Sequence, residues 1–96
     1  MLVLITYDVN TQTAAGQQRL RKIAKICQDY GQRVQNSVFE CVVDNAKLLV
    51  IKDKLLKTMD PEVDSLRFYM LGGDRKKSVE HYGAKPSFDV TEPLVL

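Results

Sequence analysis

Hydrophobic positions along the first third of the chain predict a strand followed by a helix. Residues 2–7 form an unbroken run rich in Leu, Val and Ile, which is typical of a strand covered on both faces. From Ala14 to Tyr30 apolar residues return every three or four positions, which predicts an amphipathic helix that ends at Gly31. Its apolar face would hold Leu20, Ile23, Ala24, Cys27 and Tyr30.

The middle of the chain repeats this order. Residues 33–43 are rich in Val and Phe, and the polar pair Asn36-Ser37 interrupts them, so they predict one long bent strand or two short ones. Asp44 or Asn45 is placed to cap a second helix over about 46–59. The apolar positions of that helix are Leu48, Ile51, Leu55 and Met59, with Leu49 and Leu56 beside them.

The last third of the chain predicts further strands. Leu66, Phe68 and Met70 alternate with Arg67, Tyr69 and Leu71, so residues 65–71 read as a strand, and Gly72-Gly73-Asp74 reads as a turn. A further strand is expected over 78–82, and residues 86–96 end in a short extended segment. Helices separated by strands in so short a chain favour a single α+β domain over 1–96, a split βαβ sandwich with both helices on one sheet face.

Composition narrows the class of protein. The chain has 96 residues, 45% of them hydrophobic and 27% charged, with a net charge of +2. No apolar run approaches the ~18 residues that cross a bilayer, and the start lacks the features of a signal peptide, so we expect a cytoplasmic protein without membrane contact. Cys27 and Cys41 predict buried free thiols rather than a zinc site or a disulfide framework, and His81 is the single histidine.

Positive charge gathers in two places. Between Gln17 and Arg33 the only acidic residue is Asp29, while the second cluster is Arg75-Lys76-Lys77. The bases of the first cluster are Arg19, Arg21, Lys22, Lys25 and Arg33. Such clusters are either solvated surfaces or contacts to nucleic-acid phosphates that do not depend on base sequence.

Asp8 is the candidate for chemistry. It stands at the end of the first predicted strand, where α/β sheets often place their working groups, and a carboxylate is a good ligand for a hard cation. One carboxylate makes a weak site, but a two-fold axis near Asp8 would supply a second one from another copy of the chain. The alternative is that Asp8 only caps the following turn.

Several segments together resemble the CRISPR-associated protein 2 family, the small subunit of the spacer-acquisition machinery in prokaryotic immunity. The resemblance is carried by Tyr7–Val9, the basic stretch Arg19–Lys22 and the string Gly31–Glu40, which reads Gly-x-Arg-x-Gln-x-Ser-Val-Phe-Glu. Ser65–Tyr69 and Gly83–Pro86 are similar to the branch that accompanies type I-C systems. The resemblance covers most of the chain.

The resemblance implies a ferredoxin-like fold that pairs as a two-fold homodimer across its sheets. The C-terminal extension, about 86–96, would add to the sheet of the partner through its end, Pro93 to Leu96. Two copies of Asp8 would face each other and hold one Mg²⁺, or Mn²⁺ in its place, in a metal-dependent endonuclease that hydrolyses RNA or double-stranded DNA. The same family also implies a scaffold role, in which the dimer binds DNA between dimers of the CRISPR integrase subunit.

The polar and basic residues of these matching segments have candidate roles in binding nucleic acid. Arg33 would bind phosphate or pair with Asp29 or Glu40, and the Ser37 hydroxyl would bind phosphate or the backbone. Arg19, Arg21 and Lys22 would bind nucleic acid.

The sequence leaves open the roles of two aromatic residues and of the histidine. Tyr7 and Phe39 are placed at the dimer or its groove, with core packing as the alternative for both. His81 is considered as a general base, but a surface or structural role is the stronger interpretation.

Three functions follow from these features. The first is a Mg²⁺-dependent endonuclease with paired Asp8, and the second is a DNA-binding scaffold without catalysis. The third is a regulatory module for a small ligand, which the order of elements permits but no glycine-rich anion loop supports.

Overall fold

The computed structural model describes residues 1–71 and 78–84. In chain order the elements are β1 (Leu2–Asp8), α1 (Ala14–Tyr30), β2 (Gln32–Gln35), β3 (Val38–Val42), α2 (Asn45–Thr58), β4 (Ser65–Leu71) and β5 (Ser78–Gly83). The segment over 33–43 is therefore two short strands, which meet at Asn36-Ser37. The expected turn at 72–74, the basic cluster at 75–77 and the C-terminal extension at 86–96 lie outside the described residues.

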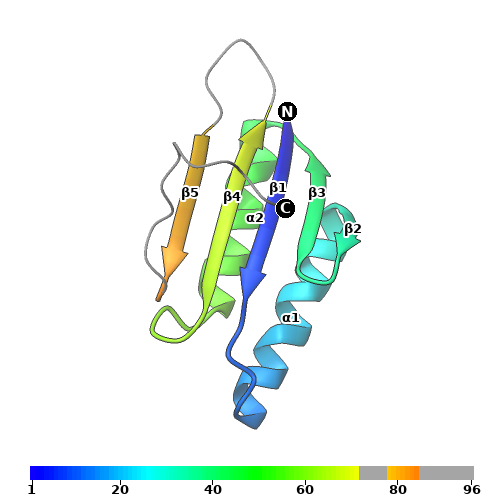
Figure 1. Cartoon of the computed structure of the whole chain (residues 1–96). Helices are drawn as coiled ribbons and strands as arrows, with labels where there is room; N and C mark the ends of the chain where they lie inside the picture. The colour runs from blue at the N-terminus through cyan, green and yellow to red at the C-terminus, as the bar shows by residue number, and fades with distance from the viewer. Residues whose placement is uncertain (72–77, 85–96) are drawn as a thin grey trace.

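The strands form one antiparallel sheet in the order β2-β3-β1-β4-β5, and both helices lie on the same face of it (Figure 1). β1 is the central strand and pairs with β3 on one side and β4 on the other. Ile5 is opposite Phe39, and Asp8 is opposite Ser65. This arrangement confirms the predicted α+β class, with an antiparallel sheet and helices on one face.

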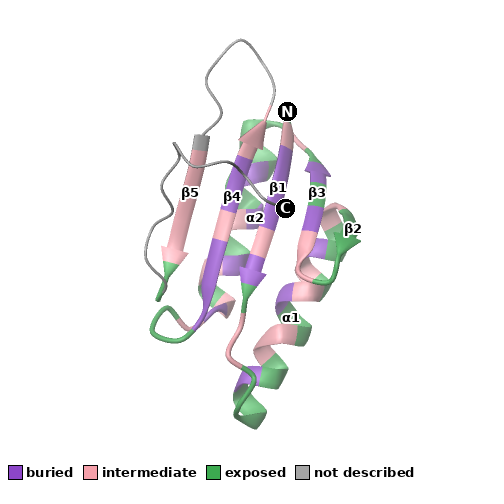
Figure 2. Ribbon diagram, viewed as in Figure 1, coloured by how far each residue is buried: buried purple, intermediate pink, exposed green. Residues whose placement is uncertain are grey.

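The core lies between the sheet and the helices. Side chains of a strand alternate between its two faces, so Val3, Ile5 and Tyr7 of β1 point toward the helices, as do Leu66 and Phe68 of β4. Figure 2 shows the buried positions on β1, β3 and β4, while β2 is exposed along its whole length. The helices contribute Ile23, Cys27, Leu48, Ile51 and Leu55. The apolar periods in the sequence thus identified both helix faces.

Local contacts determine where both helices begin and where α1 ends. The Thr13 hydroxyl accepts from the Gly16 N–H at the start of α1, and the Asp44 carboxylate accepts from the Lys47 N–H at the start of α2. Gly31 ends α1 in an extended conformation, with φ −153°, rather than in the left-handed one. Glycine is needed at Gly31 for space, because a Cβ would lie 2.5 Å from Cys41 Sγ.

Both cysteines are buried and unbridged, as predicted. Burial, and then the neighbouring Cys41, raise the pKa of Cys27 to about 12. Cys27 is therefore a protonated packing residue rather than a nucleophile. Within the described ranges, 1–71 and 78–84, neither helix is long and apolar enough to cross a membrane.

Candidate active site

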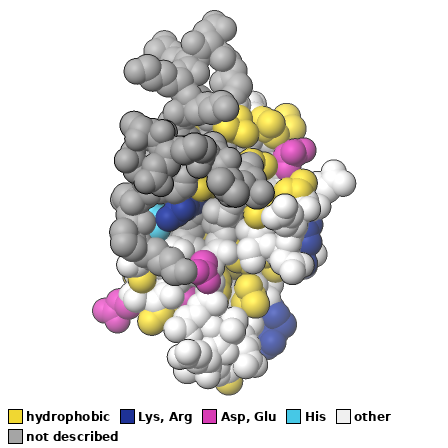
Figure 3. Space-filling model, viewed as in Figure 1, with side chains coloured by type: hydrophobic (Ala, Val, Ile, Leu, Met, Phe, Trp, Pro, Cys, Tyr) yellow, Lys and Arg dark blue, Asp and Glu magenta, His cyan; other side chains and the backbone are white. Residues whose placement is uncertain are grey.

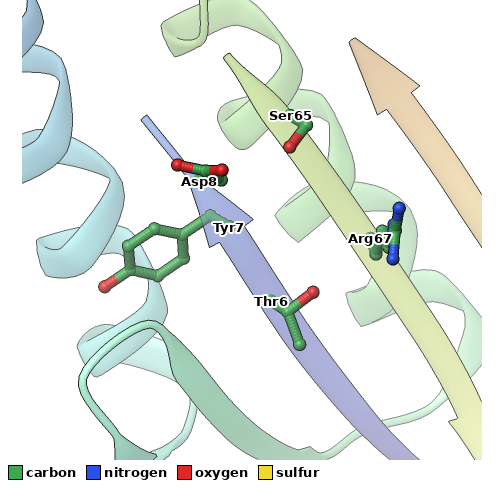
Figure 4. A pocket seen from close by; sticks show the side chains of 5 residues that line it. All are labelled: Thr6, Tyr7, Asp8, Ser65 and Arg67. Atoms are coloured by element: carbon green, nitrogen blue, oxygen red, sulfur yellow. The ribbon is translucent and has the colours of Figure 1, made fainter. Parts of the chain in front are cut away.

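A hollow of about 250 Å³ opens on the sheet face opposite the helices, where β1 ends. It is lined by Thr6, Tyr7, Asp8, Ser65 and Arg67. The strand register brings these residues together, because Asp8 is paired with Ser65 and Thr6 with Arg67. Asp8 sits at the end of β1 in Figure 4, with Ser65 and Arg67 on the neighbouring strand, while the Tyr7 ring points away. The sequence identified Asp8 but none of its three polar neighbours in the hollow.

The oxygen atoms that line this hollow are suitable ligands for a hard cation. The exposed Asp8 carboxylate and the hydroxyls of Thr6 and Ser65 are all oxygen ligands, the type that Mg²⁺ prefers. Within the described residues, however, no cluster of three or more His, Cys, Asp or Glu side chains is placed to hold a metal ion. The hollow therefore has the right oxygen ligands for Mg²⁺, but among the described residues of one chain it holds a single carboxylate.

Arg67 joins the hollow to β5. Its Nε donates to His81 Nδ1 at 3.1 Å, and the two residues are directly paired in the sheet. An imidazole that accepts at Nδ1 carries its proton on Nε2, and His81 Nε2 is buried without a hydrogen-bond partner among the described residues. Figure 3 views this face and shows the one histidine, in cyan, beside basic atoms in dark blue. His81 is thus on the same face as Asp8, two strands away, and Arg67 fixes its orientation.

The side chains of Tyr7 and Phe39 lie in the core of the protein. Both are buried in the core, with relative exposures of 6% and 0%, and their rings stack with centroids 6.1 Å apart. The Tyr7 hydroxyl donates to the Asn36 carbonyl at 3.3 Å, and burial raises its pKa. Both residues point to the helix-covered side of the sheet, and their placement at the dimer or its groove stays a prediction. Core packing, the alternative for each, is what the structure contains.

Arg33 and Ser37 lie at the far edge of the sheet. The Arg33 guanidinium is 5.1 Å from the centroid of the Phe39 ring, a cation–π contact. No ion pair found in the described part of the chain joins Arg33 to Asp29 or Glu40. Ser37 lies in the turn between β2 and β3, where its carbonyl accepts from the Tyr7 N–H at 3.1 Å. Neither residue shares the Asp8 hollow, and their binding of nucleic acid stays a prediction.

The basic residues of α1 divide into two groups. Arg21, Lys22 and Lys25 line a second hollow of about 370 Å³, together with Ile26 and Thr58 of the two helices. This surface belongs to the helix layer, whereas the Asp8 hollow opens on the other side of the sheet. Arg19 differs from its neighbours, since its guanidinium pairs with the buried Asp64 carboxylate. The structure therefore does not bring the predicted phosphate-binding bases next to Asp8.

Comparison with known proteins gives consistent matches. The family model described as CRISPR associated protein Cas2 matches residues 1–79. The chain is 60% identical over 95 residues to the CRISPR-associated endonuclease Cas2 of Halalkalibacterium halodurans, covering 99% of each. It is also 60% identical over 96 residues to the CRISPR-associated endoribonuclease Cas2 of Nitratidesulfovibrio vulgaris, covering 100% of this chain and 94% of that one.

Solved structures agree with these matches. The crystal structure of Streptococcus pyogenes Cas2 at pH 6.5 has a TM-score of 0.70 and 61% identity, over 75% of this chain and 87% of that one. A hypothetical protein from Thermus thermophilus has a TM-score of 0.66 and 32% identity, over 78% of this chain and 85% of that one. These neighbours place the fold in the ferredoxin-like class that the sequence predicted.

Proposed function

The chain belongs to the CRISPR associated protein Cas2 family, and on that premise we propose that it is a metal-dependent endonuclease of CRISPR spacer acquisition. The observation that carries the proposal is Asp8, an exposed carboxylate in a hollow of oxygen donors beside an arginine. Relatives that match nearly the whole chain are named endonuclease and endoribonuclease. The assignment to the type I-C branch stays a prediction.

The proposed active form is a homodimer. The Asp8 hollow opens on the sheet face that the helices leave uncovered, so that face of a second copy can meet it about a two-fold axis. Each chain would then contribute one Asp8 carboxylate to a shared cation. Two carboxylates with water and a substrate phosphate are the usual ligand set of Mg²⁺.

The residues of the hollow have separable roles in phosphodiester hydrolysis. A bound Mg²⁺ would polarise a phosphodiester oxygen and lower the pKa of a coordinated water. Asp8 would hold the cation, and the hydroxyls of Thr6 and Ser65 would offer hydrogen bonds to its water ligands or to the phosphate. The Arg67 guanidinium adds positive charge beside the phosphate, where charge develops in the transition state.

Removing the divalent cation tests this proposal. The full chain, treated with EDTA, is expected to lose cleavage of end-labelled single-stranded RNA or double-stranded DNA, and excess Mg²⁺ or Mn²⁺ should restore it. The measurement is the rate of product formation on both substrates across a metal titration. Cleavage that persists at the same rate in EDTA, or no cleavage of either substrate at any metal concentration, contradicts the nuclease function.

A second function, a scaffold that holds DNA between dimers of the integrase subunit, is favoured by a different observation. Arg21, Lys22 and Lys25 gather on the helix layer, away from the Asp8 hollow. A duplex bound there is not presented to Asp8. Such phosphate contacts suit a protein that positions DNA without cutting it.

Charge reversal on this surface tests the scaffold. The double variant Arg21→Glu and Lys22→Glu is expected to weaken duplex binding by about tenfold or more at low salt. Loss of two phosphate contacts should also reduce the slope of log Kd against log salt by about 2, because each contact contributes about 0.9. Fluorescence anisotropy over a salt titration measures both effects.

The matched control reverses the same amount of charge elsewhere on the helix layer. Lys47 and Lys54 lie 5.7 and 5.1 Å from the centroid of the Tyr30 ring. Their double replacement by Glu is expected to change the salt slope less than the Arg21 and Lys22 variant does. Equal losses in the two variants would mean that duplex binding depends on net charge rather than on this surface.

A further inference from the structure

Asp64 is a buried carboxylate that the proposed chemistry does not use. Its side chain is 0% exposed, and it accepts hydrogen bonds from Arg19 Nε at 2.8 Å and from Arg19 Nη2 at 3.4 Å. It also accepts from the backbone N–H groups of Asn10 at 3.0 Å and Asp60 at 2.9 Å. Burial by itself raises the pKa of Asp64, but Arg19 and the two backbone donors outweigh burial and hold the pKa below its ordinary value. The carboxylate is therefore charged and fully hydrogen-bonded.

The position of Asp64 ties together the two strands that form the hollow. The pairing of β1 with β4 ends at Asp8 and Ser65. Asp64 directly precedes Ser65, and Asn10 follows Asp8 by two residues. The hydrogen bond from Asn10 to the Asp64 side chain thus extends the attachment of the two strands one step beyond their last backbone pair.

The segment after Asp8 is also held from the side of α1. Gly16 is a buried helical residue, and a Cβ placed on it would overlap the carbonyl oxygen of Asn10. The Asn10 side chain accepts from the Gln12 N–H at 3.0 Å, which shapes the turn into the helix. Asn10 is thus fixed on one side by Asp64 and on the other by the first turn of α1.

We propose that Asp64, paired with Arg19, is a positioning residue that fixes the direction of the Asp8 carboxylate. The inference rests on the proposed role of Asp8 as metal ligand. A buried ion pair is a poor source of stability, since apolar residues of the same size are often as stable. The Arg19–Asp64 pair instead holds the backbone that follows β1 in one conformation. Arg19 then acts from within the protein, through Asp64, rather than on nucleic acid.

Replacing Asp64 with Asn tests the inference, because Asn keeps the shape but turns an amide N–H₂ toward groups that are themselves donors. Mutation of a residue that orients a metal ligand typically changes the metal affinity of the site by 10- to 100-fold. We therefore expect the dimer of the full-length variant to bind Mn²⁺, measured by electron paramagnetic resonance, about 10-fold more weakly than the parent. Its kcat should fall at low Mn²⁺ and recover at high Mn²⁺, while KM for the nucleic acid stays within about twofold.

The matched control is Asp60→Asn, at the same turn. The Asp60 side chain accepts from the Glu62 N–H at 3.0 Å, whereas the Asn10 N–H donates to Asp64. Its Mn²⁺ affinity is expected to equal that of the parent. A folded Asp64→Asn protein with parental Mn²⁺ affinity overturns the inference.

Two further variants complete the design. If Asp64→Asn does not fold, Gly16→Ala displaces Asn10 from the opposite side while the ion pair stays, and it should show the same loss that Mn²⁺ restores. Parental affinity in that variant also overturns the inference. Asp8→Ala is the reference for the proposed function: if it leaves Mn²⁺ affinity unchanged, the metal role of Asp8 fails, whereas a loss confined to Asp8→Ala rejects only the role of Asp64.

Discussion

Asp8→Ala is expected to reduce metal-dependent cleavage by about 10³-fold while the protein stays folded and dimeric. A metal ion supplies several kcal/mol of transition-state stabilisation, and each 1.36 kcal/mol corresponds to a factor of ten in rate. Among residues 1–71 and 78–84, Asp8 is the one carboxylate that lines the hollow, so none of the other acids in those ranges is placed to replace it there. Because Asp8 is exposed and outside the core, we expect the free energy of unfolding to change by less than about 0.5 kcal/mol.

Single-turnover cleavage at saturating Mg²⁺, with urea unfolding of the same preparations, measures both quantities. The control is Asp53→Ala, which removes an exposed carboxylate that pairs with Lys57 on α2, in the helix layer on the other side of the sheet from the hollow. It should cleave at the parental rate. Cleavage by Asp8→Ala at the parental rate would remove Asp8 from the mechanism and leave the scaffold as the function to pursue.

Duplex binding by Asp8→Ala separates the two proposed functions. The bases on the helix layer lie on the other side of the sheet from Asp8, so their phosphate contacts do not depend on it. Binding should therefore persist in a variant that no longer cleaves. The nuclease and the scaffold are compatible in one molecule because different surfaces carry them.

The fold was predictable to the extent that it depends on local periodicity. The helix expected over Ala14–Tyr30 has those bounds in the structure, and the second helix begins at Asn45 after its Asp44 cap. The segment over 33–43 stayed undecided, because Asn36-Ser37 permits either a bend within one strand or a turn between two. The antiparallel pairing of β2 with β3 in the structure shows that the chain turns there between two strands.

The site was predictable only in part, since it depends on register between distant segments. Asp8 is identified by its place at the end of a buried strand, but Ser65 joins it through a pairing across 57 positions of the chain. Alternation in residues 65–71 put Ser65 and Arg67 on one face and was the available signal. Arg19 looked like its basic neighbours, because a charge in the sequence does not reveal a buried partner such as Asp64.

Phe39→Ala is expected to destabilise the folded chain by about 3–5 kcal/mol, the usual result of emptying a buried phenylalanine site. Phe39 is 0% exposed, stacks on Tyr7 and lies under the Arg33 guanidinium. Truncation to alanine therefore removes packing against both neighbours and leaves a cavity in the core. Domains of this size have roughly 5–15 kcal/mol of total stability, so the variant should unfold at a much lower urea concentration.

Unfolding measured at several protein concentrations decides between this role and the dimer-groove role that the sequence suggested. Truncating a core residue lowers the free energy of unfolding at every protein concentration. Truncating an interface residue acts mainly on dimer association, which depends on protein concentration. Leu49→Ala is the control, since it deletes a large apolar side chain that is 66% exposed on α2 and should cost less than about 0.5 kcal/mol. A Phe39→Ala protein that unfolds like the parent but dissociates more readily would return Phe39 to the interface.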